Sequence, residues 1–123
     1  MKQTFGKSLL IVSAYSALSV LIGQPTLAAD SGKGHDLYKA YCTQCHGMEA
    51  DGYGVNAPYM AVQPKDHTEA KEMNARTDED LFKAIKFGGK AVNKSVLMPP
   101  WENNLSDDEI SELVVYLRTL TAP

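Results

Sequence analysis

The chain has 123 residues, of which 44% are hydrophobic, with two cysteines and a formal charge of −3. This length allows one domain and excludes large barrels and doubly wound enzyme folds. A mildly acidic chain has no electrostatic basis for general nucleic-acid binding. Two cysteines are too few for a disulfide scaffold, so their spacing matters more than their number.

Residues 1–29 have the pattern of a cleaved signal peptide. Two lysines precede the uncharged residues 9–22, and small residues follow a Gly-Gln-Pro turn at the boundary. This order of a basic start, a short apolar stretch and small residues is typical of export signals. A spanning helix needs about 20 apolar residues, so a retained membrane anchor is the weaker alternative. We expect cleavage after Ala29, with cleavage after Ala28 as the alternative, and a mature domain over residues 30–123 in the periplasm.

The mature domain has few apolar residues from which to form a hydrophobic core. The leader holds two of the 12 basic residues and no acid, so the remainder has ten basic and 15 acidic residues, a charge of −5. Leu, Ile, Val and Phe make up 17 of its 94 residues, below the roughly 20% at which a charged chain starts to look disordered. We therefore expect a disulfide, a metal or a large apolar cofactor to help fill the core.

Residues 42–46 read Cys-Thr-Gln-Cys-His, a C-x-x-C-H motif. In an exported protein this motif indicates attachment of a c-type haem. The thiols of Cys42 and Cys45 form thioethers with the two haem vinyl groups, and the spacing lets one turn of chain span both. The imidazole of His46 then lies under the iron and can be its proximal ligand.

Two other kinds of site share part of this motif. A thioredoxin-like thiol pair requires a βαβ pattern, which the sequence lacks. A zinc site needs four ligands, and His35 or His67 would have to be the fourth. Both histidines are expected at the surface, His35 at the start of a helix and His67 in a loop. A bis-histidine haem that uses His67 is the weaker alternative to methionine ligation.

With these features the sequence resembles the class I cytochromes c from about residue 32 to residue 120. In that family a glycine and an aromatic residue of the first helix cross a Leu-x-x-Tyr pair of the last. Here the matching residues are Gly34, Tyr38, Leu113 and Tyr116. The resemblance implies an all-α fold with three to five helices around one covalently bound haem. It also implies one-electron transfer rather than enzymatic activity.

The resemblance assigns residues on both sides of the haem. The family has a proline twelve residues after the haem histidine, whose carbonyl accepts a hydrogen bond from that ring, and Pro58 has this offset from His46. The sixth ligand is a methionine in a loop between helices. Met98, which stands directly before two prolines, fits this role better than its main competitor Met73. Trp101 is expected to bond a haem propionate or to pack in the core.

Capping signals predict two helices in the second half of the chain. Thr77-x-x-Asp80 is close to a capping box for a helix over residues 78–87 that stops at a Gly-Gly pair. A full capping box, Ser106-x-x-Glu109, opens the last helix, whose apolar residues recur at i, i+3, i+4 and i+7. The first helix should run from about residue 33 to the motif, and a short helix can form near residues 58–62. No strand is predicted.

Residues 81–101 contain no acid but four lysines, Lys83, Lys86, Lys90 and Lys94. The simpler interpretation is a solvated helix face. The sharper hypothesis is a patch beside the haem edge that orients the protein toward an acidic redox partner.

The sequence thus predicts a periplasmic one-electron carrier that binds redox proteins and meets a membrane only through partner complexes. One alternative is a dedicated cytochrome subunit of a periplasmic dehydrogenase or oxidoreductase complex. A less favoured alternative is a haem enzyme or sensor with an open iron position.

Overall fold

The structure, a computed structural model, describes residues 31–122, so the predicted signal peptide lies outside the described residues. The described chain forms five α-helices and two 3-10 helices and has no strand, as predicted. No helix in this part of the chain has the length and apolar character that crossing a bilayer requires. The elements are α1 (Ser31–Tyr41), α2 (Thr43–His46), η1 (Ala57–Tyr59), α3 (Ala70–Asn74), α4 (Asp78–Phe87), η2 (Gly89–Val92) and α5 (Asp107–Thr119).

Both predicted capping signals begin a helix. The Thr77 hydroxyl accepts a hydrogen bond from the Asp80 amide at 3.1 Å, and the Asp80 carboxylate accepts from the Thr77 amide at 3.2 Å. Ser106 and Glu109 make the same reciprocal pair before α5. These bonds satisfy N–H groups that have no partner inside the helix, so they fix where each helix begins. α4 ends at Gly88, whose φ of +80° favours glycine.

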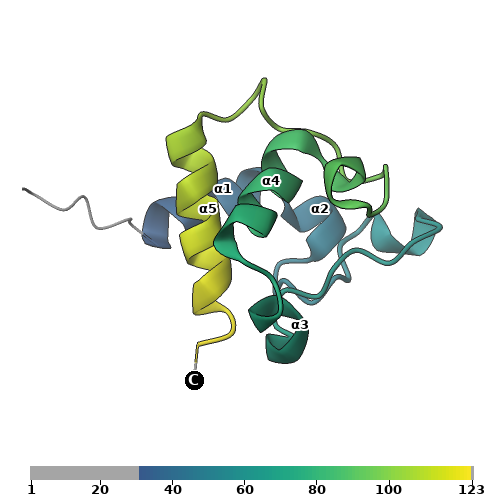
Figure 1. Ribbon diagram of the computed structural model, residues 1–123. Coiled ribbons are helices and arrows are strands. Elements are labelled where there is room, and N and C mark those ends of the chain that lie inside the picture. Colours follow the sequence, from purple (N-terminus) through teal and green to yellow (C-terminus); the bar gives the residue numbers. More distant parts are fainter. Residues whose placement is uncertain (1–30, 123) are drawn as a thin grey trace, which may run out of the picture.

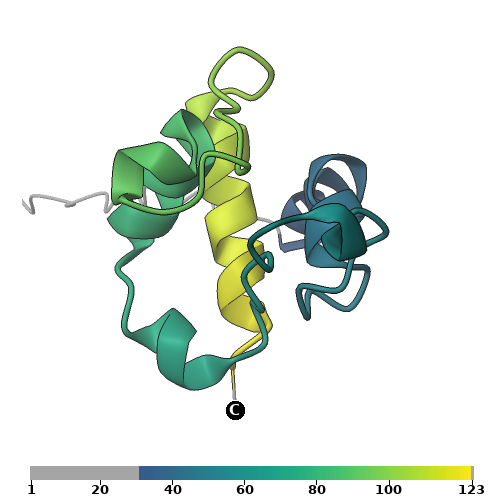
Figure 2. The ribbon, with the colours of Figure 1, turned by 90° about the vertical axis from the view of Figure 1, so that its right-hand side faces the viewer.

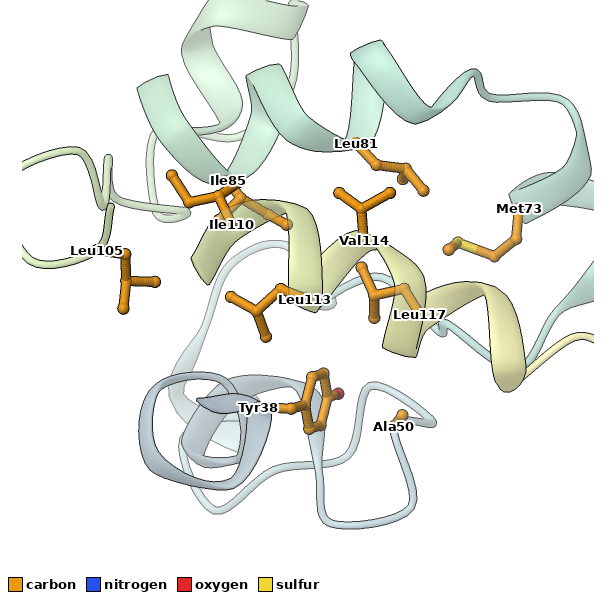
Figure 3. Packing of buried hydrophobic residues seen from close by; sticks show 10 residues of the cluster. All are labelled: Tyr38, Ala50, Met73, Leu81, Ile85, Leu105, Ile110, Leu113, Val114 and Leu117. Carbon is orange, nitrogen blue, oxygen red and sulfur yellow. The ribbon is translucent and has the colours of Figure 1, made fainter. Parts of the chain in front are cut away.

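Helix α5 lies between α1 and α4, which places it at the centre of the fold (Figures 1 and 2). Figure 3 shows Tyr38 of α1 on one side of α5 and Leu81 and Ile85 of α4 on the other. The four apolar residues that recur along α5 are all buried, which confirms the predicted helix face: Ile110, Leu113, Val114 and Leu117. Burying each side chain of this size contributes about 1.5–3 kcal/mol.

Helices α1 and α5 approach each other closely at Gly34, as the family resemblance predicts. A Cβ atom here would lie 2.7 Å from the Cβ of Tyr116 and would overlap the backbone carbonyl of Glu112. One turn later, the Tyr38 ring packs against the Tyr116 ring with their centroids 5.3 Å apart. Tyr38 is 1% exposed. The absent side chain lets the two backbones touch, and this contact sets the position of the C-x-x-C-H motif that follows α1.

Arg118 of α5 ties the end of α3 to the start of α4. Its Nε donates to the Asp78 carboxylate at 2.7 Å. The other guanidinium nitrogens donate to the carbonyls of Met73 and Arg76 at 2.8 and 2.6 Å. The Met73 carbonyl also accepts from the Arg76 amide at 3.1 Å, so the planar guanidinium adds a second donor at the end of α3 while its charge is paired with Asp78. Helix α3 therefore depends on a residue more than 40 positions away in the sequence.

Replacing Gly34 by alanine is expected to lower the free energy of unfolding by about 1–3 kcal/mol, because the added methyl group overlaps backbone. This loss exceeds the roughly 1 kcal/mol that alanine gains over glycine inside a helix. Thermal unfolding followed by circular dichroism measures the effect. Asp36→Ala, on the exposed face of the same helix, is the control and should stay within about 0.5 kcal/mol of the wild type. Equal stability of the two variants would contradict the close approach.

Candidate functional site

A cavity of about 920 Å³ lies among the helices. This volume is near the upper end of the roughly 300–1,000 Å³ typical of cofactor sites. The helices contribute apolar side chains to its lining, among them Leu81, Ile85, Leu113 and Leu117. The structure also brings five of the six predicted site residues to this cavity, namely Cys42, Cys45, His46, Met98 and Trp101. The sixth, Pro58, does not line it.

The C-x-x-C-H motif lies on a nearly continuous helical turn after α1. The Cys42 amide donates to the Tyr38 carbonyl at 2.9 Å, and the His46 amide donates to the Cys42 carbonyl at 2.9 Å. These helical bonds place Cys42, Cys45 and His46 within little more than one turn, so all three side chains reach the same cavity. The C-x-x-C-H spacing therefore brings the two thiols and the imidazole to one side of the helical turn.

The hydrogen bond of the His46 ring defines which nitrogen faces the cavity. Nδ1 lies 2.9 Å from the backbone carbonyl of Lys65. Because a carbonyl only accepts, Nδ1 carries the proton and Nε2 keeps a free lone pair. Burial lowers the pKa of His46, which favours the neutral imidazole that binds a metal. Such a bond to the outer nitrogen orients a ligand ring and increases its basicity.

The prediction that the Pro58 carbonyl accepts this hydrogen bond is wrong, because the acceptor is Lys65. Pro58 is exposed in η1, on a loop that Figure 1 shows projecting away from the helices. Amides of Gly54 and Asn56 hold the start of this loop against the end of the motif helix at 3.1 and 2.9 Å. The chain therefore passes the His46 ring only on its return, where Lys65 offers its carbonyl. The local feature next to Lys65 is Pro64, which fixes its own φ and prevents a helix from continuing through this part of the loop.

His67 is partly buried, so the prediction that it lies on a loop surface is wrong. Its ring stacks on the His46 ring, with centroids 4.3 Å apart and planes 20° apart. Its Nδ1 lies 3.3 Å from the Tyr38 hydroxyl. Burial, with the nearby His46, lowers the pKa of His67 to about 3. Two stacked rings leave no space for an ion between them, so this arrangement does not provide a bis-histidine pair. His35 is exposed, as predicted.

The cysteines do not have the properties of a reactive thiol pair. Burial, with Cys45 nearby, raises the pKa of Cys42 to about 12. Thiol-disulfide enzymes need the opposite shift, because the thiolate is the reactive form. The zinc alternative is not supported either. Between residues 31 and 122, no three His, Cys, Asp or Glu side chains gather closely enough to hold a metal ion.

Met98 reaches the cavity from a loop that is fixed against the end of α4. Its carbonyl accepts a hydrogen bond from the Gly89 amide at 3.0 Å. A Cβ on Gly89 would lie 3.1 Å from the Met98 Cβ, and one on Gly88 would lie 2.8 Å from the Met98 carbonyl. The Gly-Gly pair, predicted only as a helix stop, therefore also makes room for the methionine loop. The Trp101 amide closes the loop onto the Ile85 carbonyl at 3.1 Å.

Trp101 is partly buried beside the cavity. Its ring meets the Tyr41 ring edge to face, with centroids 5.4 Å apart and planes 66° apart. It also packs against the buried core cluster. The two expectations for Trp101, core packing and contact with a bound group, are therefore compatible with a single position.

The donor set and the lining fit a haem. Two thiols at the C-x-x-C spacing, an imidazole with a free Nε2 and a thioether sulfur all reach one large, mainly apolar cavity. Figure 2 shows α1 and α2 on one side of α5 and α4 with η2 on the other, so the motif and the methionine loop approach from different sides. Together with the all-α fold, these features define a c-type cytochrome.

Comparison with known proteins gives the family. Residues 29–117 match the family described as cytochrome c oxidase, cbb3-type, subunit III. The chain belongs to this family of electron-transfer cytochromes, whose members carry haem c. It is also similar to cytochrome c-554(547) of Halothiobacillus neapolitanus, with 29% identity over 93 residues that cover 76% of this chain and 99% of that protein.

Further similarities involve larger redox proteins. Quinohemoprotein alcohol dehydrogenase ADH-IIG of Pseudomonas putida is 27% identical over 96 residues, which cover 76% of this chain but only 11% of the dehydrogenase. A chain of the Kuenenia stuttgartiensis reducing HAO-like protein complex Kustc0457/Kustc0458 superposes with a TM-score of 0.59 and 27% identity, over 72% of this chain and 41% of that one. The KustC0563 c-type cytochrome shares the fold, with a TM-score of 0.58, 22% identity and coverage of 72% and 98%.

Proposed function

We propose that this protein is a one-electron carrier with one haem c, attached through thioethers to Cys42 and Cys45 and bound at its iron by His46 and Met98. The main support for this proposal is that His46 and Met98 line the same cavity. His46 has a free Nε2, and Met98 lies on a loop that is fixed to the end of α4. A bound haem would exchange single electrons through its iron. His46 and Met98 would both bind the iron, which would favour electron transfer over substrate binding there.

The choice of Met98 rests on where the other methionines lie. Met60 lines the cavity, but it follows η1, whose preceding loop is hydrogen-bonded to the motif helix and so belongs to the His46 side. A methionine on that side would not be placed to bind the iron together with His46. Met73 also lines the cavity, but it is fully buried in the core cluster, and in Figure 3 its sulfur points toward Leu117. Met48 is 63% exposed and does not line the cavity.

Met98→Ala is expected to abolish the far-red charge-transfer band of the ferric Met–iron bond and to lower the reduction potential, because methionine ligation raises it. Met60→Ala is the matched control and should keep the band. Optical spectra of the oxidised holoproteins and potentiometric titration measure both effects. If the band survives in Met98→Ala but is lost in Met60→Ala or Met73→Ala, the ligand is the methionine whose replacement removes the band. No band in the wild type would favour an open-site haem protein.

We also propose that the lysines of residues 81–101 form a docking patch for acidic redox partners. Lys83, Lys90 and Lys94 are exposed, and Lys94 lines the cavity. Lys86 contributes less, because its ammonium contacts both carboxylate oxygens of Asp107 at 2.7 and 2.9 Å. A positive patch in a chain of net negative charge orients the protein as it approaches an acidic partner.

Charge reversal tests this patch. In the double variant Lys90→Glu/Lys94→Glu, oxidation of the reduced holoprotein by hexacyanoferrate(III), an anionic oxidant, should slow by about an order of magnitude at low salt. The dependence of the rate on ionic strength should weaken as well. Lys39→Glu adds negative charge at an exposed position on α1 and serves as the control. Equal rates and salt slopes in the double variant and the control would dismiss the docking patch.

The proposed location is the periplasm, supported by the export pattern of residues 1–29 and by the haem attachment motif. A second candidate role is that of a cytochrome subunit within a larger oxidoreductase. It is favoured by the similarity to parts of larger redox proteins, because the chain spans only 11% of the dehydrogenase and 41% of the chain from the Kuenenia complex. Size-exclusion chromatography of native periplasm distinguishes the roles, since a free carrier elutes as a small protein and a subunit elutes with its complex.

A further inference from the structure

The face of the His46 imidazole is covered by a second imidazole. The rings of His46 and His67 are nearly parallel, with planes 20° apart and centroids 4.3 Å apart. A flat ring packed on a flat ring blocks rotation about the Cβ–Cγ bond. The Nδ1 bond to Lys65 holds only one edge of the His46 ring. The stack therefore restrains the one motion of His46 that its hydrogen bond leaves free.

His67 is itself held at both ends. Its backbone amide donates to the Ala50 carbonyl at 2.7 Å. Ala50 is fully buried and has a φ of +61°, a left-handed conformation that is costly for alanine. At the other end, the Tyr38 hydroxyl lies 3.3 Å from Nδ1 of His67. Figure 3 shows this hydroxyl directed toward the Ala50 side of the α1 helix.

The support for His67 extends to the centre of the fold. Tyr38 is 1% exposed and packs against Tyr116 of α5 with ring centroids 5.3 Å apart. A continuous series of contacts therefore runs from the α1–α5 crossing through Tyr38 and His67 to the His46 ring. Outer contacts of this kind orient metal ligands and tune the metal.

We propose that His67 is a positioning residue that fixes the plane of the axial ligand His46 by stacking on it. The inference rests on the proposed function, since it requires His46 to bind the haem iron. The plane of an axial imidazole determines how its π orbitals overlap the iron d orbitals. Fixing that plane gives the oxidised protein one ligand orientation and therefore one electronic state.

The test compares ferric holoproteins by low-temperature electron paramagnetic resonance. His67→Leu fills the space without a flat ring, and a displaced and broadened low-field g value is expected, with a shifted reduction potential. His67→Phe restores a flat ring, and its spectrum is expected to stay close to that of the wild type. His35→Leu makes the same replacement at an exposed histidine that packs against the Tyr116 ring, and it should change neither readout.

Unchanged g values in a folded His67→Leu protein would overturn the proposal, as would equal shifts in His67→Leu and His67→Phe. If His67→Leu does not accumulate with haem, His67→Phe decides alone. Because this variant keeps a flat ring, a g value shifted more than that of His35→Leu would exclude stacking as the cause. Failure of the proposed function gives a different result. The wild type itself would then lack a low-spin signal from histidine and methionine ligands.

Discussion

The fold depends on a cavity of about 920 Å³ among the helices, lined mainly by apolar side chains, and contacts between distant parts of the chain hold its walls. Leu81, Ile85, Leu113 and Leu117 line it while also belonging to the buried core cluster. These four side chains are buried, but the chain has few others of their kind, because Leu, Ile, Val and Phe make up only 17 of the 94 residues that follow residue 29. A domain of this length buries only about 60–65% of its unfolded surface, so a large apolar group bound in the cavity would enlarge a small hydrophobic core. In this account the haem is both the redox centre and part of the hydrophobic core.

The walls are held by contacts between distant parts of the chain. Gly34 allows α1 to touch α5, and this contact sets the position of the motif helix. Arg118 joins α3 and α4 to α5, while the Gly88-Gly89 pair holds the Met98 loop. Each side of the site is therefore fixed to α5 or α4 independently of the other side. The two proposed ligands can approach an iron from opposite faces because separate elements carry them.

Local signals predicted the parts of the fold that local chemistry controls. The two capping boxes and the glycine stop lie within a few residues of the helices that they delimit. The predicted partners in the α1–α5 crossing were also correct, because only glycine permits that approach. Helix α3 could not be predicted, since its five residues are too few for a periodic pattern and the contact of Arg118 with the Met73 carbonyl spans 45 positions. The same holds for η2, which is formed where the methionine loop folds back on Gly89.

The site was predicted best where a contiguous motif determines it. Cys42, Cys45 and His46 reach one cavity because a single helical turn brings them there. The acceptor of the His46 ring hydrogen bond depends instead on the path of the returning loop. The sequence offset therefore predicted Pro58, whereas the acceptor is the Lys65 carbonyl. The burial of His67 depends on Tyr38, 29 positions earlier, and on His46, and no local pattern signals these contacts.

The central claim, that the haem completes the fold, is tested most directly by circular dichroism of the Cys42→Ser/Cys45→Ser chain produced without haem, compared with the holoprotein. The account predicts that the haem-free chain has little helix and shows no cooperative thermal transition, whereas the holoprotein is helical and unfolds cooperatively. A haem-free chain that is as helical as the holoprotein and unfolds in one sharp transition would contradict it.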